Sequence, residues 1–140
     1  MTMERFTKSF IELRRRRGVR QLIKFSIVGT FNTGVDWVFY LLFTRWFGIY
    51  YLIAKILSFL ISSASAFVMN RRWTFRSDNP RVRRQYFKFM IANVCGLGIN
   101  SLMMYVSVGV FHLWDIWGLI IATSCSMLWN FFVNKFWVFR

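Results

Sequence analysis

Amide and carboxylate side chains occur inside apolar segments of this 140-residue chain. Asn32 and Asp36 are four residues apart, and Asn93 and Asn100 are seven apart, so each pair shares one face of a helix. A carboxylate at mid-membrane depth costs about 2.5 to 3.5 kcal/mol on insertion scales, so Asp36 should face a bundle interior or a hydrated cleft. We expect Lys55 to be its partner, either in a structural ion pair or as part of a hydrated polar route.

The last apolar segment extends this polar lining. Asn130 and Asn134 are four residues apart there, and Thr123 and Ser126 precede them by one to two helical turns. The predicted polar pathway consists of Asn32, Asp36, Lys55, Asn93, Asn100 and Asn130.

An Asn-basic-x-Trp-x-Phe-Arg element occurs twice and is the most specific motif in the sequence. Its amide and aromatic positions are Asn70, Trp73, Phe75, Asn134, Trp137 and Phe139. The rings suit the headgroup boundary of a membrane, and asparagine can cap the last helical carbonyls. Beyond this anchoring role, the basic residues predict a cluster that holds a lipid phosphate through charge-assisted hydrogen bonds. These residues are Arg71, Arg72, Arg76, Lys135 and Arg140.

No residue pattern indicates catalysis or a cofactor. Cys95 and Cys125 lie in apolar runs without His or Cys at ligand spacing, and His112 has no carboxylate or cysteine spaced to form a metal site or triad. The sequence contains no phosphate-binding glycine loop, dinucleotide fingerprint, HExxH or nucleophile elbow. We therefore expect no metal, no cofactor, no catalytic residues and no enzymatic activity.

The composition requires a non-aqueous surrounding. Hydrophobic residues make up 56% of the chain, charged residues make up 17%, and the mean hydropathy is +0.42. A soluble domain would carry roughly 45 to 50% apolar and about 25% charged residues. Four apolar stretches, at residues 23–44, 51–70, 86–111 and 115–134, are each near the ~20 residues that span a hydrocarbon core. Because they do not alternate with period two, they predict an all-α membrane protein with four transmembrane helices.

The net charge of +14 is placed unevenly along the chain. Of the 19 Lys and Arg residues, 17 lie on the side shared by the N-terminus, the middle connection and the C-terminus, the exceptions being Arg45 and Lys55. The positive-inside rule then places both termini and the middle connection in the cytoplasm. Topology and attraction to anionic lipids account for this charge, so nucleic acid is not an expected partner.

Residues 1–21 precede the first apolar stretch and do not form a cleavable signal, because that stretch is long and lacks a cleavage pattern. Phe6, Phe10 and Leu13 recur at helical spacing among charged residues, which predicts a basic amphipathic helix in the membrane interface. A disordered basic tail is the alternative.

The chain repeats itself with an offset of 64 residues. Lys24-Phe25 aligns with Lys88-Phe89, Gly34 with Gly98, and the two copies of the closing motif with each other. This repeat predicts a duplicated helical hairpin over about residues 20–76 and 84–140, with a turn at residues 77–80 as the linker and residues 22–140 as the transmembrane domain. Since each half crosses twice, both hairpins enter from the same side, as parallel repeats.

These motifs resemble the GtrA-like family of small four-helix membrane proteins over about residues 20–140. The resemblance rests on Lys24-Phe25-Ser26-Ile27-Val28-Gly29 with Asn32, on Asn70-Arg71-Arg72-Trp73-Thr74-Phe75, and on the segment from Trp129 to Arg140. It implies a role in cell-surface polysaccharide or glycolipid synthesis, by flipping a polyprenyl-phosphate-linked sugar across the bacterial inner membrane. The expected partners are this lipid, anionic lipids, a second copy of the chain and a membrane glycosyltransferase.

Two other function classes stay open. A non-transporting scaffold for a glycosyltransferase predicts that Asp36 and Asn100 tolerate apolar replacement. A small multidrug or ion transporter predicts proton-coupled uptake of cations, which the cytoplasmic arginines disfavour.

Overall fold

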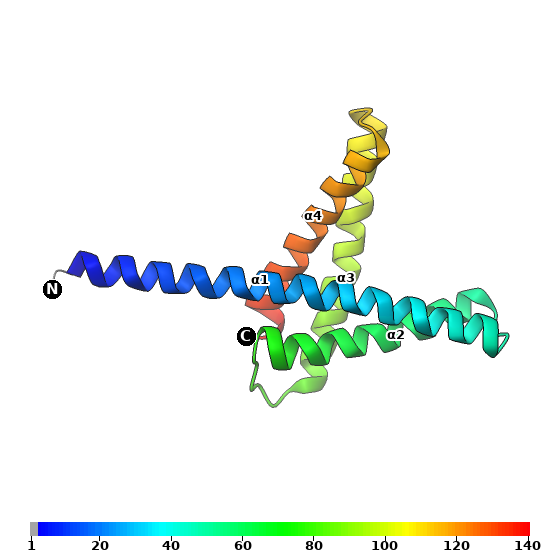
Figure 1. Ribbon diagram of the computed structural model, residues 1–140, viewed down its shortest axis with the longest axis horizontal. Helices are drawn as coiled ribbons and strands as arrows, with labels where there is room; N and C mark the ends of the chain where they lie inside the picture. Colours follow the sequence, from blue (N-terminus) through cyan, green and yellow to red (C-terminus); the bar gives the residue numbers. More distant parts are fainter. Residues whose placement is uncertain (1–2) are drawn as a thin grey trace. The chain divides into compact units, whose positions relative to one another are not determined.

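Four long helices form the described part of the chain, which comprises residues 3–140 for the backbone and, for side chains, Glu12 and residues 15–140. In this computed structural model each helix continues into a turn of π-helix (Figure 1). The α-helices are α1 (Met3–Leu41), α2 (Tyr51–Met69), α3 (Val82–Met104) and α4 (Asp115–Val133). The π-helical turns are η1 (Leu42–Trp46), η2 (Asn70–Thr74), η3 (Tyr105–Val110) and η4 (Asn134–Val138). No strand occurs between residues 3 and 140, so the predicted all-α fold with four long helices is confirmed.

The chain divides into two compact units, Met1–Arg76 and Ser77–Arg140. In the first unit α2 runs back along α1, and in the second α4 runs back along α3, so each unit is an antiparallel hairpin (Figure 1). Helices α2 and α4 have the same length of 19 residues, and their bounds differ by 64 positions. The backbone of the two hairpins thus follows the repeat seen in the sequence.

The turn between the two helices of each hairpin has the same geometry in both copies. Gly48 has φ +62° and its repeat counterpart His112 has φ 53°. Only glycine adopts this left-handed region without a steric cost, so His112 is held there by the bonds around the turn. The N–H of Leu113 donates to the carbonyl of Ser107 at 3.0 Å, and Ile49 bonds Phe43 in the equivalent way at 2.9 Å.

Every helix ends on a phenylalanine that closes its π-helical turn. The backbone N–H of this residue donates to the carbonyl five positions earlier, at 2.8 to 3.3 Å. The four residues are Phe47, Phe75, Phe111 and Phe139. The wide turn satisfies carbonyl groups that an ordinary helix end would leave without an intrahelical donor.

Three helical segments are long and apolar enough to cross a membrane: Tyr51–Thr74, Val82–Val110 and Asp115–Val138. Helix α1 is not among them, because Asn32, Asp36 and neighbouring threonines and glycines lower the hydropathy of its apolar half. The crossing predicted for residues 23–44 therefore stays a prediction. The residues of this predicted crossing include Asn32 and Asp36, which were assigned to the polar pathway.

Helix α1 is continuous over 39 residues, or about 58 Å at the usual rise. It therefore joins the N-terminal segment and the apolar half without a break. The backbone of residues 3–21 is helical, whereas the predicted aromatic face of Phe6, Phe10 and Leu13 lies on side chains outside the described residues.

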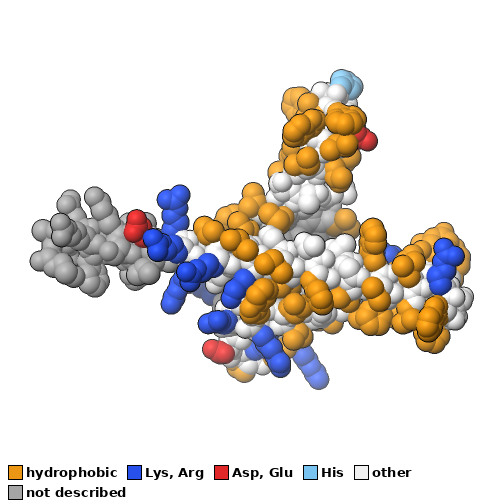
Figure 2. All heavy atoms as spheres, in the orientation of Figure 1, with side chains coloured by type: hydrophobic (Ala, Val, Ile, Leu, Met, Phe, Trp, Pro, Cys, Tyr) orange, Lys and Arg blue, Asp and Glu red, His pale blue; other side chains and the backbone are white. Residues whose placement is uncertain are grey.

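Many large apolar side chains are exposed on the outside of both hairpins, and Figure 2 shows patches of them on each. Only 17% of the most apolar stretch of the α4 segment is buried, and 28% in the α2 segment. The buried positions are mostly small or polar, such as Ala54, Ser58 and Ala122, each at 0% exposure. Small residues let the helix backbones approach, as in membrane helix pairs, while most large apolar residues face outward and only a few phenylalanines are buried.

Candidate functional site

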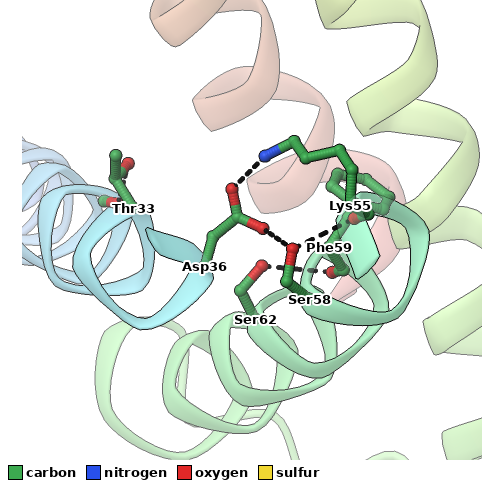
Figure 3. Close-up of polar contacts among 7 residues, drawn as sticks. Thr33, Asp36, Lys55, Ser58, Phe59 and Ser62 are labelled. Carbon is green, nitrogen blue, oxygen red and sulfur yellow. Dashed lines mark hydrogen bonds and ion pairs between the residues drawn. The ribbon is translucent and has the colours of Figure 1, made fainter. Parts of the chain in front are cut away.

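A carboxylate, an ammonium group and a hydroxyl meet within the first hairpin. Lys55 Nζ donates to Asp36 Oδ2, and Ser58 Oγ donates to Asp36 Oδ1 at 2.7 Å (Figure 3). The structure thus pairs Asp36 with Lys55, the partner expected from the sequence. Ser58 was missed, although its position one turn after Lys55 places it on the same face of α2.

Two helices position this cluster, which we call the Asp36 cluster (Asp36, Lys55 and Ser58). Asp36 lies about 20 Å along α1 from residue 23, and Lys55 lies about 6 Å from the start of α2. The side chain of Asp36 is 14% exposed, whereas that of Lys55 is 54% exposed. The long lysine side chain can reach the carboxylate while staying near the turn that joins α1 and α2.

The neighbouring hydroxyl groups are satisfied by their own helices. Ser62 Oγ donates to the carbonyl of Phe59 at 3.1 Å, and Thr33 Oγ1 donates to that of Gly29 at 3.1 Å. In Figure 3 the Thr33 side chain lies apart from the cluster. Asp36 is therefore the residue that brings together groups from both helices.

The turn before α2 carries a tyrosine pair near Lys55. The rings of Tyr50 and Tyr51 have centroids 4.6 Å apart. A side-chain hydrogen bond with Tyr51 raises the pKa of the Tyr50 hydroxyl above its ordinary value. Tyr50 therefore stays neutral at physiological pH, and the ammonium of Lys55 is the charge that this end of α2 contributes.

The second hairpin has no charge at the equivalent level. Asn100, the counterpart of Asp36, donates from Nδ2 to Ser126 Oγ at 3.4 Å. The counterparts of Lys55 and Ser58 are Leu119 and Ala122. The ion pair is thus specific to the first hairpin. In the second hairpin the hydrogen bond between Asn100 and Ser126 takes its place.

In the middle of each hairpin an asparagine with a buried Oδ1 atom faces the other helix, and the two asparagines come from opposite helices. Asn32 on α1 is 6% exposed; its Nδ2 donates to the carbonyl of Val28 at 2.9 Å, and its Oδ1 finds no partner among the described residues. In the second hairpin its counterpart is Gly96, and the amide comes from Asn130 on α4. Asn130 Oδ1 is likewise buried without a partner in the described part of the chain.

The predicted Asn93 lies on α3 and is partly buried. No side-chain hydrogen bond links it to another described residue of its hairpin. Its place on the predicted polar pathway stays a prediction.

The closing motif packs against the first helix of its own hairpin. Lys24 Nζ lies 5.0 Å above the ring of Trp73, and in the second hairpin Lys88 Nζ lies 5.1 Å above Trp137. Such cation–π contacts are worth about 0.5 to 1 kcal/mol at exposed sites. The pairs Lys24-Phe25 and Lys88-Phe89 could have indicated these contacts. In the sequence they were evidence for the repeat and the family resemblance, and their contact with the closing motif was not predicted.

The phenylalanines of the motif make an equivalent ring pair in each hairpin. Phe75 lies 6.0 Å from Phe25 and Phe139 lies 6.3 Å from Phe89, measured between centroids. These contacts fasten the end of the second helix to the first.

The asparagines of the motif are buried and bond within their own helix ends. Asn70 Oδ1 accepts from Thr74 Oγ1 at 3.0 Å, and Asn134 Nδ2 donates to the carbonyl of Asn130 at 2.7 Å. Both asparagines are at most 3% exposed. They support the π-helical turns, which is a structural role.

The predicted phosphate-binding residues divide between the hairpins. Arg71, Arg72 and Arg76 follow α2, and Lys135 and Arg140 follow α4. Lys135 Nζ lies over the rings of Phe131 and Phe136, at 5.4 and 5.5 Å. The grouping of all five in one cluster stays a prediction.

The sequence matches a known family. Residues 24–139 match the family described as GtrA/DPMS, transmembrane domain. The chain belongs to this family. The GtrA/DPMS match begins at Lys24 and ends at Phe139, so it includes the Asp36 cluster, the first closing motif and the second one up to Phe139.

A relative of the GtrA/DPMS chain is known from Bacillus subtilis (strain 168). The uncharacterized membrane protein YngA is 30% identical over 123 residues, which cover 86% of this chain and 80% of YngA. The chain is therefore a membrane protein, with helices able to span a bilayer.

Proposed function

We propose that this protein translocates a polyprenyl-phosphate-linked sugar across the membrane for the synthesis of a cell-surface polysaccharide or glycolipid. Membership of the GtrA/DPMS family supports this class of substrate. The observation that carries the proposal is the Asp36 cluster, an ion pair with a hydroxyl inside the apolar half of a hairpin. An ionised group at this depth is costly, which favours a functional use over simple packing.

The cluster suits a sugar because it contains both hydrogen-bond acceptors and donors. A sugar hydroxyl can donate to the carboxylate of Asp36 and accept from the ammonium of Lys55. In the same hairpin the buried Oδ1 atom of Asn32, which has no partner in the described part of the chain, supplies a further acceptor. Within the membrane these polar groups of the protein would replace the water around the sugar. The polyprenyl tail stays in lipid beside the exposed apolar side chains.

The proposal includes a topology and an assembly state. Helix α1 provides the fourth crossing through residues 23–44, both termini lie in the cytoplasm of a bacterial cell, and the protein resides in the inner membrane. Four helices are too few to surround a polar pathway, so we propose that the transporting unit is a homodimer. Crosslinking in native membranes and labelling of single cysteines from each side test both statements.

The function is tested by lipid flux in liposomes. Purified protein is reconstituted with fluorescent polyprenyl-phosphate sugars, and an added membrane-impermeant quencher reports the fraction that reaches the outer leaflet. We expect faster exchange than in protein-free liposomes, and loss of the acceleration in Asp36→Ala. Exchange equal to that of protein-free liposomes for every lipid sugar tested would contradict transport.

A scaffold for a membrane glycosyltransferase is the competing outcome of that test. It predicts no flux and copurification of the enzyme, unaffected by Asp36→Ala. The polar residues inside the first hairpin favour transport over this role, since docking does not require a carboxylate at membrane depth.

A further inference from the structure

A basic hollow lies at the end of the second hairpin where α3 begins. It has a volume of about 120 Å³ and its lining is polar except for the buried Val138. All of its residues belong to the second hairpin: Asn79, Arg81, Arg84, Gln85, Lys88, Val138 and Arg140. Four of them are cations, and no carboxylate side chain lines the hollow.

One face of α3 supplies most of these groups. Arg81, Arg84, Gln85 and Lys88 recur at helical spacing from the N-cap onward, so they point to the same side of the first two turns. The positive end of the helix dipole lies at the same place, which favours an anion there.

Asn79 of the linker and Arg140, which follows η4, complete the lining of the hollow. Asn79 Oδ1 accepts from the backbone N–H of Arg81 at 3.0 Å, and Asn79 Nδ2 donates to the carbonyl of Arg140 at 3.4 Å. Lys88 Nζ donates to the carbonyl of Trp137 at 3.2 Å. The linker, α3 and the segment after η4 are thus joined around the cations.

Two of the cations are available to a ligand. In the described part of the chain, the guanidinium groups of Arg81 and Arg84 make no hydrogen bond or ion pair. Guanidinium groups bind phosphate oxygens in a bidentate manner, and these two side chains lie one helical turn apart.

Gln85 adds a buried amide with an unused atom. It is 2% exposed, and its Nε2 donates to Ser77 Oγ at 2.8 Å, while its Oε1 finds no partner among the described residues. Because the serine hydroxyl can donate or accept, exchanging the amide atoms would still leave one of them unpaired. A buried amide without a partner at the wall of a cationic hollow indicates a ligand that carries a hydroxyl or further oxygen atoms.

The first hairpin repeats the residue types but not the enclosure. The counterparts of the basic and amide positions are Arg17, Arg20, Gln21, Lys24 and Arg76. There α1 continues through these positions from Met3, and the counterpart of Asn79 is Arg15. The first copy therefore has neither a helix N-terminus nor a linker turn beside its cations.

We infer that the hollow binds the phosphate group of a phospholipid-type headgroup, with Arg81 and Arg84 on the phosphate oxygens and Lys88 and Arg140 beside them. The binding of phosphate rests on the hollow alone, whereas the choice of a polyprenyl phosphate as ligand rests on the function proposed above. The site adds residues to the phosphate cluster expected from the sequence, of which it shares only Arg140.

Binding to the purified full-length protein in dodecyl maltoside micelles, which carry no phosphate group, tests this inference. The probes are farnesyl phosphate, farnesol and inorganic phosphate, measured by titration calorimetry. We expect farnesyl phosphate to bind at least tenfold more weakly to Arg81→Gln/Arg84→Gln than to the wild type, and farnesol binding to stay unchanged. Arg81→Lys/Arg84→Lys keeps the charge and should recover part of the affinity, which separates loss of a ligand contact from loss of the fold.

The repeat offers a matched control for general electrostatics. Arg17→Gln/Arg20→Gln removes the same charge from the equivalent turn of α1, and Arg83→Gln removes one from α3 outside the hollow. Affinities within threefold of the wild type in both controls support the site. Equal weakening in Arg17→Gln/Arg20→Gln and Arg81→Gln/Arg84→Gln would overturn it, as would an unchanged affinity in the latter.

Two further measurements distinguish a lipid headgroup from free phosphate as the ligand, and failure of the site from failure of the proposed function. Inorganic phosphate that binds as tightly as farnesyl phosphate assigns the site to free phosphate and overturns the headgroup assignment, whereas failure to compete at equal concentration supports it. Binding that depends on Arg81 and Arg84 without lipid flux in liposomes leaves the site intact and refutes translocation. Flux that survives in Arg81→Gln/Arg84→Gln, although its affinity for farnesyl phosphate is lost, leaves the site intact and overturns its use in translocation.

Discussion

The side chain of Asn130 fills the space that a Cβ atom at Gly96 would occupy: such an atom would lie 2.5 Å from Asn130 Nδ2 and 2.8 Å from its Cγ. In the first hairpin the equivalent positions carry Asn32 and Ala66, so the amide and the small residue are exchanged between helices. At this level of the repeat each hairpin therefore keeps one amide, although neither position retains the same residue.

This exchange predicts a rescue within the second hairpin. Gly96→Asn alone should destabilise the protein by about 1 to 3 kcal/mol, because two amides then compete for one space. Gly96→Asn/Asn130→Ala reproduces the arrangement of the first hairpin and should recover most of that loss. Thermal unfolding in detergent measures both. A double variant no more stable than Gly96→Asn would contradict the equivalence, and Gly98→Ala, with open space around it, is the control.

The second prediction separates structure from transport in the Asp36 cluster. Asp36→Asn/Lys55→Leu gives the first hairpin the residues of the second and removes both charges together. We expect it to fold with a stability near that of the wild type, since replacing an ion pair by neutral groups is often neutral, and to lose lipid flux. Lys55→Leu alone leaves Asp36 with only the hydrogen bond from Ser58 and should cost about 1 to 3 kcal/mol.

Flux and unfolding are measured on the same reconstituted samples. Wild-type flux in Asp36→Asn/Lys55→Leu would show that the ion pair serves only packing. The scaffold function would then become the better explanation of the fold.

The third prediction concerns close packing near the turn of the second hairpin. A Cβ atom at Gly118 would lie 2.5 Å from Val108 Cγ2 and 3.3 Å from Met104 Sδ. Gly118→Ala should therefore lower the free energy of unfolding by about 1 to 3 kcal/mol, and Val108→Ala in the same chain should relieve the clash. Gly34→Ala, with nothing within 4 Å of the added atom, should be neutral or stabilising by up to about 1 kcal/mol. Equal effects at Gly118 and Gly34 would refute the contact.

The fourth prediction compares the two turns. Gly48 and His112 both have positive φ, so a β-carbon is strained at either position. Gly48→Ala should cost about 1 kcal/mol, and His112→Gly should stabilise the folded state by up to about 1 kcal/mol. Chemical unfolding of the two variants in the same detergent checks the signs. Destabilisation by His112→Gly would mean that the imidazole makes a contact worth more than the backbone strain.

Helix number, the repeat and the Asp36–Lys55 pair could be predicted because they depend on hydropathy, on an ungapped offset and on the cost of a lone charge in lipid. The π-helical turns could not be predicted, because no residue type indicates that a carbonyl accepts a hydrogen bond from the N–H five positions later in the chain. Ser58 escaped prediction because serine is common in packed membrane helices and usually bonds its own backbone.

The basic hollow escaped prediction for a different reason. Arg81 and Arg84 were assigned to topology, and only the start of α3 at Val82 beside Asn79 distinguishes them from the same residue types in α1. Sequence reasoning instead favoured the closing motif, whose lysine partners and aromatic pairs prove to be contacts within each hairpin.

The phenylalanine-closed turns give the return arm of each hairpin one common length. Tyr51–Thr74 and Asp115–Val138 both comprise 24 residues, up to about 36 Å at the α-helical rise, against a hydrocarbon thickness of about 30 Å. A helix longer than the bilayer tilts or selects a thicker membrane. Since both halves exceed the bilayer by the same amount, they share one preferred membrane thickness, and thinning the lipid would strain the two repeats together.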